Sequence, residues 1–291
     1  GTVFLMGKLK TKGVLLPGGQ MMTGGGAPVI ESQDGSIRTA LAPGSGRPTV
    51  HGTNPTPTIQ LDTGTYNQVI RGLRITGQGT ALQSNHNSDV VLRDLRIDNQ
   101  SAGEDGLDVR NPSGDWVMRN VRVRSRDDAL RFSGGSAQVF VGDATVSSER
   151  NRGIAVLNPT GGSVELRNSQ VTSTGDSGVV LKGVSGAEIK NTRIENTGND
   201  ALVLNGGSDN IRADSVTIRS AGGNGALVQD ASAIDLENLS IPSALVDHGV
   251  EVVNSTDVDL RQATLTGGQS GVKYRNVTVG GLEDVRVDTA A

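Results

Sequence analysis

The sequence predicts an all-β, right-handed parallel β-helix, a solenoid of about ten to eleven coils with three short strands per coil and almost no α-helix. One turn motif recurs every 22 to 26 residues through most of the chain. Each repeat holds three short runs in which apolar and polar residues alternate, as they do in half-buried strands. Aromatic residues make up only 2% of the chain, which suits a narrow lumen packed with aliphatic side chains.

The repeat is indexed by a corner residue that is usually Asp or Asn. These residues tolerate a left-handed backbone and form local hydrogen bonds. Stacked about 4.8 Å apart, they can also bond one another along the axis. We therefore interpret the corner column as a structural ladder, with the members Asp94, Asn120, Asp143, Asn168, Asn191, Ser215, Asn238, Gln262 and Asp284.

Apolar positions on each side of the corner define the predicted core. The strand before the corner points two residues inward, such as Val90 and Leu92, and the strand after it points its first and third residues inward. A further strand opens each coil, as in Gly106–Val109. Trp116 falls in an inward position, so we assign it to the core and not to sugar stacking.

The chain divides into an irregular N-terminal part, residues 1–57, and one continuous regular β-helix, residues 58–291. Turn residues interrupt the first part, and we expect it to cover one end of the stack, where open strand edges would otherwise invite aggregation. Within it we expect strands at Val3–Met6 and Gly13–Leu16, a turn at Met21–Gly26, and an inserted loop or hairpin at Glu31–Pro48.

Composition excludes several kinds of site. The absence of Cys rules out disulfides and cysteine-based zinc sites. His51, His86 and His248 occupy different coil positions, which argues against a shared metal site. Asp247 precedes His248 and allows an acid–base pair, but a turn role fits His248 better. The net charge of −4 argues against non-specific nucleic-acid binding.

An acidic cluster is the candidate catalytic site. Asp105 and Asp128 each precede the opening strand of neighbouring coils, and we expect them to meet Asp127, Asp108 and Arg131 within about two strand spacings. Crowded carboxylates raise one another's pKa and can act as an acid–base pair or hold Ca²⁺. An adjacent arginine can bind a sugar carboxylate. Turn chemistry is the favoured interpretation of these acids, because the same position recurs at Asp176–Ser177, Asn199–Asp200 and Asp247–His248.

Basic columns flank the corner and are candidate binding residues. Like charges on adjacent strands repel unless acids such as Asp62, Asp94 and Asp98, or an anionic ligand, compensate them. A solvated self-paired face and a polyanion-binding face both remain open. The columns are Arg71, Arg93, Arg119, Arg167 and Lys190 before the corner, and Arg74, Arg96 and Arg122 after it.

An apolar stripe follows the acidic cluster along the outward face of the opening strands. It comprises Ala155, Val180, Val203 and Leu227. A hydrolytic cleft would carry polar groups there, so the stripe favours contact with another protein surface or with a covering loop. Val180, Val203 and Leu227 are therefore candidate binding residues.

The coil pattern resembles the pectate-lyase-like β-helix superfamily. The segment Ser125–Leu130 resembles the Asp-Asp element of polygalacturonase-type glycoside hydrolases. The later Gly-His-Gly and Arg-Ile-Lys elements of those enzymes, and the Arg-x-Pro-x-Arg stretch of pectate lyases, do not occur in the chain. The resemblance therefore implies the fold more strongly than it implies catalysis.

The N-terminal motifs resemble β-helix passenger segments of bacterial autotransporters, including the inverse type. They are Gly1–Met6, Gly24–Gly26, Gly46–Val50 and Val69–Leu73. This resemblance implies a secreted segment on the bacterial cell surface, tethered to an outer-membrane β-barrel that lies outside this chain. It carries over no catalytic residues.

The leading hypothesis is a non-catalytic surface passenger, monomeric, that acts in adhesion or displays a binding surface. Its partner would be a surface protein or polysaccharide of host or bacterium, with a role in virulence. One alternative is a polysaccharide lyase or glycoside hydrolase acting on acidic polysaccharide. Another is a phage tail-fibre or tailspike segment, which would be trimeric. We expect no cofactor, and Ca²⁺ is the ion that the carboxylates would suit.

Overall fold

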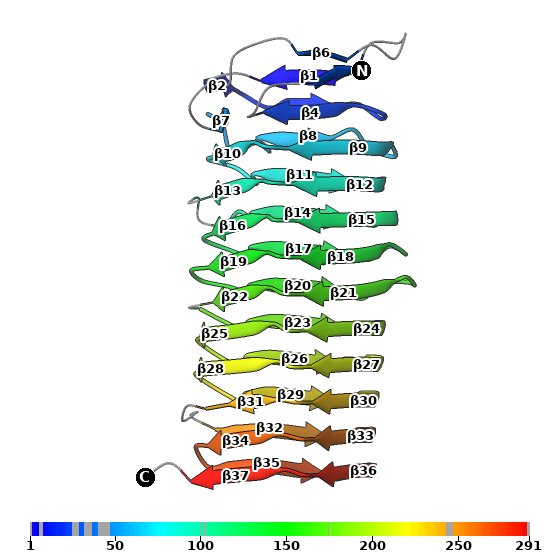
Figure 1. Cartoon of the computed structure of the whole chain (residues 1–291), viewed down its shortest axis with the longest axis vertical. Helices are drawn as coiled ribbons and strands as arrows, with labels where there is room; N and C mark the ends of the chain where they lie inside the picture. Colours follow the sequence, from blue (N-terminus) through cyan, green and yellow to red (C-terminus); the bar gives the residue numbers. More distant parts are fainter. Residues whose placement is uncertain are drawn as a thin grey trace.

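The computed structural model of the chain is a parallel β-helix of three long sheets, as predicted (Figure 1). It describes residues 2–5, 8–24, 29–31, 37–39, 47–99, 101, 103–173, 175–242 and 247–289. All of the secondary structure in these ranges is β-strand, and none of them contains a helix that could cross a membrane. The chain steps from sheet A to sheet B to sheet C in each coil, so strands of one sheet come from successive coils.

Each sheet stacks its strands in parallel and in order along the axis. Sheet A contains β1 (Thr2–Leu5), β4 (Met21–Gly24), β9 (Tyr66–Arg71), β12 (Ser88–Arg93), β15 (Ser113–Arg119), β18 (Gln138–Gly142), β21 (Ser163–Arg167), β24 (Ser185–Lys190), β27 (Asp209–Asp214), β30 (Ser232–Glu237), β33 (Thr256–Arg261) and β36 (Thr278–Glu283). Sheet B contains β2 (Lys8–Thr11), β7 (Thr49–Gly52), β10 (Arg74–Gly77), β13 (Arg96–Asn99), β16 (Arg122–Ser125), β19 (Thr145–Ser148), β22 (Gln170–Ser173), β25 (Arg193–Thr197), β28 (Thr217–Ala221), β31 (Ser240–Ile241), β34 (Thr264–Gly267) and β37 (Arg286–Thr289). Sheet C contains β3 (Val14–Leu16), β8 (Ile59–Leu61), β11 (Leu82–Asn85), β14 (Leu107–Arg110), β17 (Leu130–Ser133), β20 (Ile154–Leu157), β23 (Val179–Lys182), β26 (Leu202–Asn205), β29 (Ala226–Gln229), β32 (His248–Val253) and β35 (Ser270–Arg275).

The N-terminal part already belongs to the stack. Strands β1, β2 and β3 pair in parallel with β4, β7 and β8 of the next coil. The turn predicted at Met21–Gly26 is wrong for its first four residues, which form β4; the rest lies outside the described residues. Met22 pairs with Ile70 and is buried, so inward packing outweighs the turn signal of the glycines. A hairpin is expected within Glu31–Pro48. An antiparallel pair is present, but it begins earlier, as β5 (Val29–Glu31) and β6 (Ile37–Thr39).

Inward residues of successive coils stack into continuous columns that form the core. Trp116 lies in one of them between Val90 and Val139, fully buried as predicted. Its ring meets Phe132 edge-on at 6.0 Å between centroids, and its Nε1–H donates to a backbone oxygen at 3.3 Å. Burying each large aliphatic side chain in these columns contributes about 1.5–3 kcal/mol.

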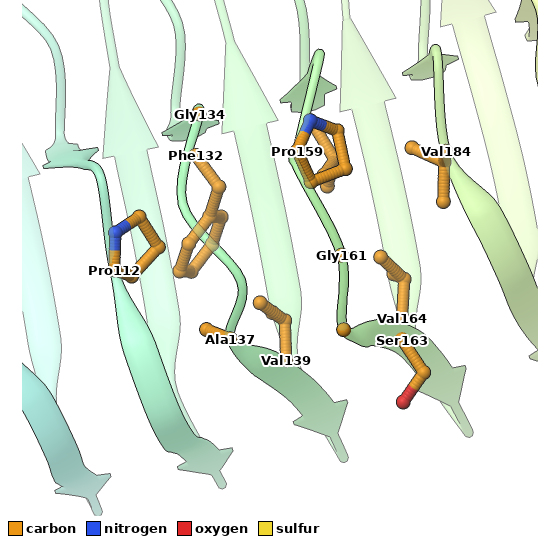
Figure 2. A pocket seen from close by; sticks show the side chains of 12 residues that line it. Pro112, Phe132, Gly134, Ala137, Val139, Pro159, Gly161, Ser163, Val164 and Val184 are labelled. Atoms are coloured by element: carbon orange, nitrogen blue, oxygen red, sulfur yellow. The ribbon is translucent and has the colours of Figure 1, made fainter.

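A small apolar crevice lies beside Phe132, where side chains do not fill the space completely. It opens between the turns that connect sheet C to sheet A, and Pro112, Pro159 and Val184 line it from different coils (Figure 2). Its volume is about 10 Å³, which is room for roughly one water molecule. The crevice is therefore too small to receive a ligand.

The corner ladder is confirmed. Its residues all adopt a left-handed backbone, with φ between 48° at Asn191 and 57° at Ser215. Several also bond one another along the axis, as where Asn120 Nδ2 donates to Asp94 Oδ1 at 2.6 Å. A second left-handed column, which the sequence indexing missed, follows sheet C; its non-glycine members are His86, Asn111, Asn158, Asp230, Asn254 and Asn276. His86 is therefore a turn residue.

Asn120 tests whether the ladder works through backbone conformation or through hydrogen bonding. We expect Asn120→Ala to lower the free energy of unfolding by about 1–2 kcal/mol, because alanine tolerates φ near 51° poorly and loses the bond to Asp94. Asn120→Gly keeps the backbone and should cost less than about 1 kcal/mol. Urea unfolding measures both, and equal losses would assign the effect to the hydrogen bond alone.

Candidate functional site

The acidic cluster lies where the chain enters sheet C. Asp105 and Asp128 occupy the same position in successive coils, two residues before the first inward residue of β14 and β17. Asp108 of β14 is the register partner of Arg131 of β17, so their side chains leave adjacent strands on the same outward face. Arg131 Nη1 lies 3.9 Å from Asp105 Oδ2. The structure therefore brings these four predicted residues together.

Asp127 lies at the margin of this cluster. Its Oδ1 accepts a hydrogen bond from Asn151 Nδ2 at 3.0 Å, and its backbone oxygen accepts one from Ser148 Oγ at 2.7 Å. Its charge still acts on Asp105, although less than the charges of Asp128 and Asp108. Asp127 therefore lies in a turn, where its charge acts on Asp105, and it is held in place by hydrogen bonds from the next coil.

Two arginines that were not predicted neutralise the deeper carboxylates. Arg110 Nη2 lies 2.6 Å from Asp108 Oδ2. Arg152 binds Asp128 through two side-chain bonds, Nη2 to Oδ2 at 2.7 Å and Nε to Oδ1 at 3.0 Å. The sequence held both signals, because Arg110 follows Asp108 by one strand period and Arg152 takes the position of Asp105 and Asp128 in the following coil.

The pKa of Asp105 is shifted by its surroundings in the cluster. Burial, followed by the charges of Asp128 and Asp108, raises the pKa of Asp105 to about 7, while Arg131 opposes the rise. A buried carboxyl ionises reluctantly because it loses hydration, and nearby negative charges add to the cost. Near neutral pH this carboxyl is therefore poised to give or take a proton.

Only part of the cluster reaches the surface. The side chains of Asp108 and Asp128 are 2% and 1% exposed, whereas those of Asp105 and Arg131 are 11% and 38% exposed. Asp108 Oδ1 and Arg131 Nε are buried, and neither has a hydrogen-bond partner among the residues that the structure describes. An acceptor and a donor are thus left open on adjacent strands, which is unusual for buried polar groups.

Turn chemistry accounts for some of the same groups. Asp128 Oδ1 accepts the backbone N–H of Arg152 at 3.1 Å, and Asp200 Oδ1 accepts that of Asn224 at 2.7 Å. These carboxylates therefore cap the next coil. Asp105 differs from Asp200 because two arginine-bound carboxylates, those of Asp108 and Asp128, lie beside it.

The three histidines lie apart along the stack, in β7, after β11 and in β32. The ring of His248 contacts Ser270 Oγ at 2.8 Å and Lys273 Nζ at 3.1 Å, whereas Asp247 accepts a bond from Gln269. The suggested Asp–His pair is therefore replaced by a network in which Lys273 also pairs with Glu251 at 3.0 Å. Within the described ranges no group of His, Asp and Glu is arranged to hold a metal ion.

The apolar stripe is more covered than its sequence suggested. Its first three side chains stack in register, and Ala155, Val180 and Val203 are 0%, 8% and 6% exposed. Leu227 is half-buried. Neighbours one strand spacing away cover one another, so the stripe does not present the open apolar surface that would favour a protein partner.

The six candidate arginines form two adjacent columns, as the indexing predicted. Arg71, Arg93 and Arg119 end successive strands of sheet A in register. Arg74, Arg96 and Arg122 begin the strands of sheet B that follow. All lie at the corner between sheets A and B, away from the acidic cluster on sheet C.

A family model described as the right-handed β-helix region matches residues 105–238 and 153–288, together more than half of the chain. No curated protein matches the chain in sequence.

Several solved structures have a similar fold at low sequence identity. The A-module of a mannuronan C-5 epimerase from Azotobacter vinelandii has a TM-score of 0.69 at 12% identity, with 100% of this chain and 91% of that chain covered. A periplasmic alginate epimerase gives 0.53 at 13% identity, covering 99% and 76%. A DFA-IIIase from Arthrobacter chlorophenolicus A6, in complex with GF2, gives 0.55 at 15% identity, covering 93% and 77%. At these identities the likeness concerns the fold.

The raised pKa of Asp105 predicts a pH dependence of stability. The unfolded chain ionises this carboxyl near 3.8 and the folded chain near 7. The cost of ionising it in the folded state is therefore absent below about pH 4 and complete above about pH 7. The free energy of unfolding of the wild type should therefore fall between about pH 4 and pH 7. We expect Asp105→Asn to lack this fall and to be more stable than the wild type by on the order of a few kcal/mol at pH 8.

Asp214→Asn is a control of opposite sign for these unfolding curves. Hydrogen bonds from Asn238 and then Ser215 lower the pKa of Asp214. Its contribution is therefore present at neutral pH and is lost as the pH falls. Parallel curves for wild type and Asp105→Asn between pH 4 and 7 would contradict the assignment of the raised pKa.

Proposed function

The chain belongs to the right-handed β-helix family, and on that premise we propose that it is an enzyme that cleaves an acidic polysaccharide at the Asp105 cluster. One observation carries the proposal. Asp105 is a partly accessible carboxyl with a pKa raised to about 7, and it lies beside the accessible guanidinium of Arg131. This pairing joins a proton donor that works near neutral pH with a group that binds carboxylates.

Each residue of the cluster has a distinct proposed role. Protonated Asp105 donates its proton to the glycosidic oxygen as the bond from that oxygen to the anomeric carbon breaks, which is general-acid catalysis. A water molecule forms the new bond to the anomeric carbon, and the proton that this water releases restores the acid. Arg131, whose side chain is 38% exposed, offers its positively charged guanidinium to a sugar carboxylate. Asp108 and Asp128 lie beneath them and act as positioning residues. Each is bound by its own arginine, and their charges raise the pKa of Asp105.

The similar structures suggest which substrates to test first. Two of them are epimerases named for mannuronan and alginate, which are polymers of acidic sugars, and a third is a DFA-IIIase bound to GF2. Their likeness to this chain lies in the fold, and β-helices of one fold host different chemistries. The proposed chemistry therefore rests on the Asp105 cluster. The names of the similar structures serve only to decide which substrates are assayed first.

Surface display is a second candidate function. It is favoured by the uninterrupted stack, in which each sheet continues without a break from the N-terminal coils to the last (Figure 1). A stalk or adhesive passenger on the bacterial surface would use this rigidity, and it would place the chain outside the cell. An exposed apolar stripe would have favoured this role over catalysis. Because the side chains of the stripe are covered, that reason no longer applies.

Turnover assays with Asp105→Asn test the enzyme proposal. Alginate, polygalacturonate, hyaluronan and a neutral fructan are incubated with wild type, and chain cleavage is followed by reducing ends. We expect cleavage of at least one acidic polymer, falling as the pH rises above about 7, and a loss of about 100-fold or more in kcat for Asp105→Asn.

Asp200→Asn is the matched control, because Asp200 occupies the same coil position outside the cluster and is likewise buried. It should keep wild-type activity. Arg131→Gln should raise KM more than it lowers kcat for a carboxylated polymer. Cleavage that survives Asp105→Asn, or no cleavage of any polymer, would contradict the proposal.

A further inference from the structure

The corner between sheets A and B carries an uncompensated row of positive charge near the N-terminal end of the stack. We propose that this arginine edge, made of Arg71, Arg93, Arg119, Arg74, Arg96 and Arg122, is a binding surface for a linear acidic polysaccharide lying along the helix axis. The surface lies away from sheet C, and the inference does not depend on the catalytic activity proposed for the Asp105 cluster.

The arginine edge is regular because it follows the register of the strands. Arg71, Arg93 and Arg119 pair in sequence across three successive coils. On the other side of the corner, Arg74, Arg96 and Arg122 pair with one another in the same way. Five of the six side chains are on exposed residues, and Arg96 is half-buried. Guanidinium groups therefore recur about every 4.8 Å along the axis, in two parallel rows.

Few of the acids in these three coils lie at the corner, where they could balance the charge. Asp98 Oδ2 is shared by Arg74 Nη2 at 2.9 Å and Arg96 Nε at 2.8 Å. Asp94 is already bonded by Asn120 in the corner ladder. Among the described residues, neither Arg93 nor Arg122 forms an ion pair. Two carboxylates thus face six guanidinium groups, an arrangement that repels itself when no anion is bound.

The same columns are compensated further along the stack. In sheet A, Lys190 pairs with Asp214, and Arg212 pairs with Glu237. Arg261 Nη2 lies 2.5 Å from Asp235 Oδ2. The chain as a whole carries a net charge of −4. The excess of positive charge is therefore local to the arginine edge and is not a consequence of composition.

Chemistry favours a polysaccharide over a nucleic acid as the occupant. The guanidinium fork matches carboxylate and sulfate groups, and a linear polymer with one acidic group per sugar can meet a repeating row. Binding of single-stranded nucleic acid relies on exposed aromatic rings for base stacking. Phe140, the ring that Arg119 contacts, is covered by that guanidinium at 4.6 Å from its centroid, so it offers no such platform.

Calorimetric titration tests the arginine edge, with alginate oligosaccharides and a heparin hexasaccharide as probes at low ionic strength. We expect wild type to bind at least one probe with a Kd that rises steeply with salt. Arg93→Gln combined with Arg122→Gln should weaken binding by about tenfold, because it removes two guanidinium groups that form no ion pair among the described residues.

Two further variants separate specific binding from a general charge effect. Arg212→Gln combined with Arg261→Gln removes the same charge from arginines that are already paired, and should change Kd less than twofold. Asp98→Asn frees Arg74 and Arg96 and should tighten binding. Circular dichroism confirms that each variant is folded.

Defined outcomes overturn the inference. No binding of either probe at low salt would do so, as would equal weakening by the two double variants. Tighter binding of a thymidine oligonucleotide, lost in the Arg93→Gln and Arg122→Gln variant, would replace the polysaccharide by a nucleic acid. Weaker binding by Asp98→Asn would show that the ion pairs, and not the free charge, hold the ligand.

Discussion

Parallel register between coils is the constraint on which the rest of the structure depends. Each strand hydrogen-bonds to the same position of the next coil, about 4.8 Å away, so any residue type repeated in sequence becomes a column in space. Apolar positions become the core, and Asn or Asp at the corner becomes a ladder of left-handed residues such as Asn120 and Asn191. Even the N-terminal coils join this stack through β4, β7 and β8.

Stacking also sets the electrostatics of the surface, because equal charges in one column cannot separate. Most of the molecule solves this by alternation, as where Lys190 lies beside Asp214. Two places do not. At the acidic cluster, burial combines with neighbouring negative charge to raise the pKa of Asp105. At the arginine edge, exposed guanidinium groups outnumber their acids. Both departures are local, and both lie where an external molecule can reach.

Fold and site carry different weight in assigning function. The family match and the similar structures establish a β-helix, an architecture that enzymes of different substrates share. What a particular β-helix does depends on a few outward side chains. Here Asp108 and Asp128 are buried and each is bound by its own arginine, so Asp105 and Arg131 are the members of the cluster that reach the surface.

The sequence by itself determined the coil, its register, the corner ladder and the inward place of Trp116, because period-two alternation and repeat spacing are local properties. It also placed Asp105, Asp108, Asp128 and Arg131 together, since register is additive along a solenoid. Only the tertiary structure decided that β4 is a strand, that Arg110 and Arg152 hold the deeper carboxylates, and that the apolar stripe is covered. Side-chain reach and burial depend on neighbours from other coils, which spacing alone does not specify.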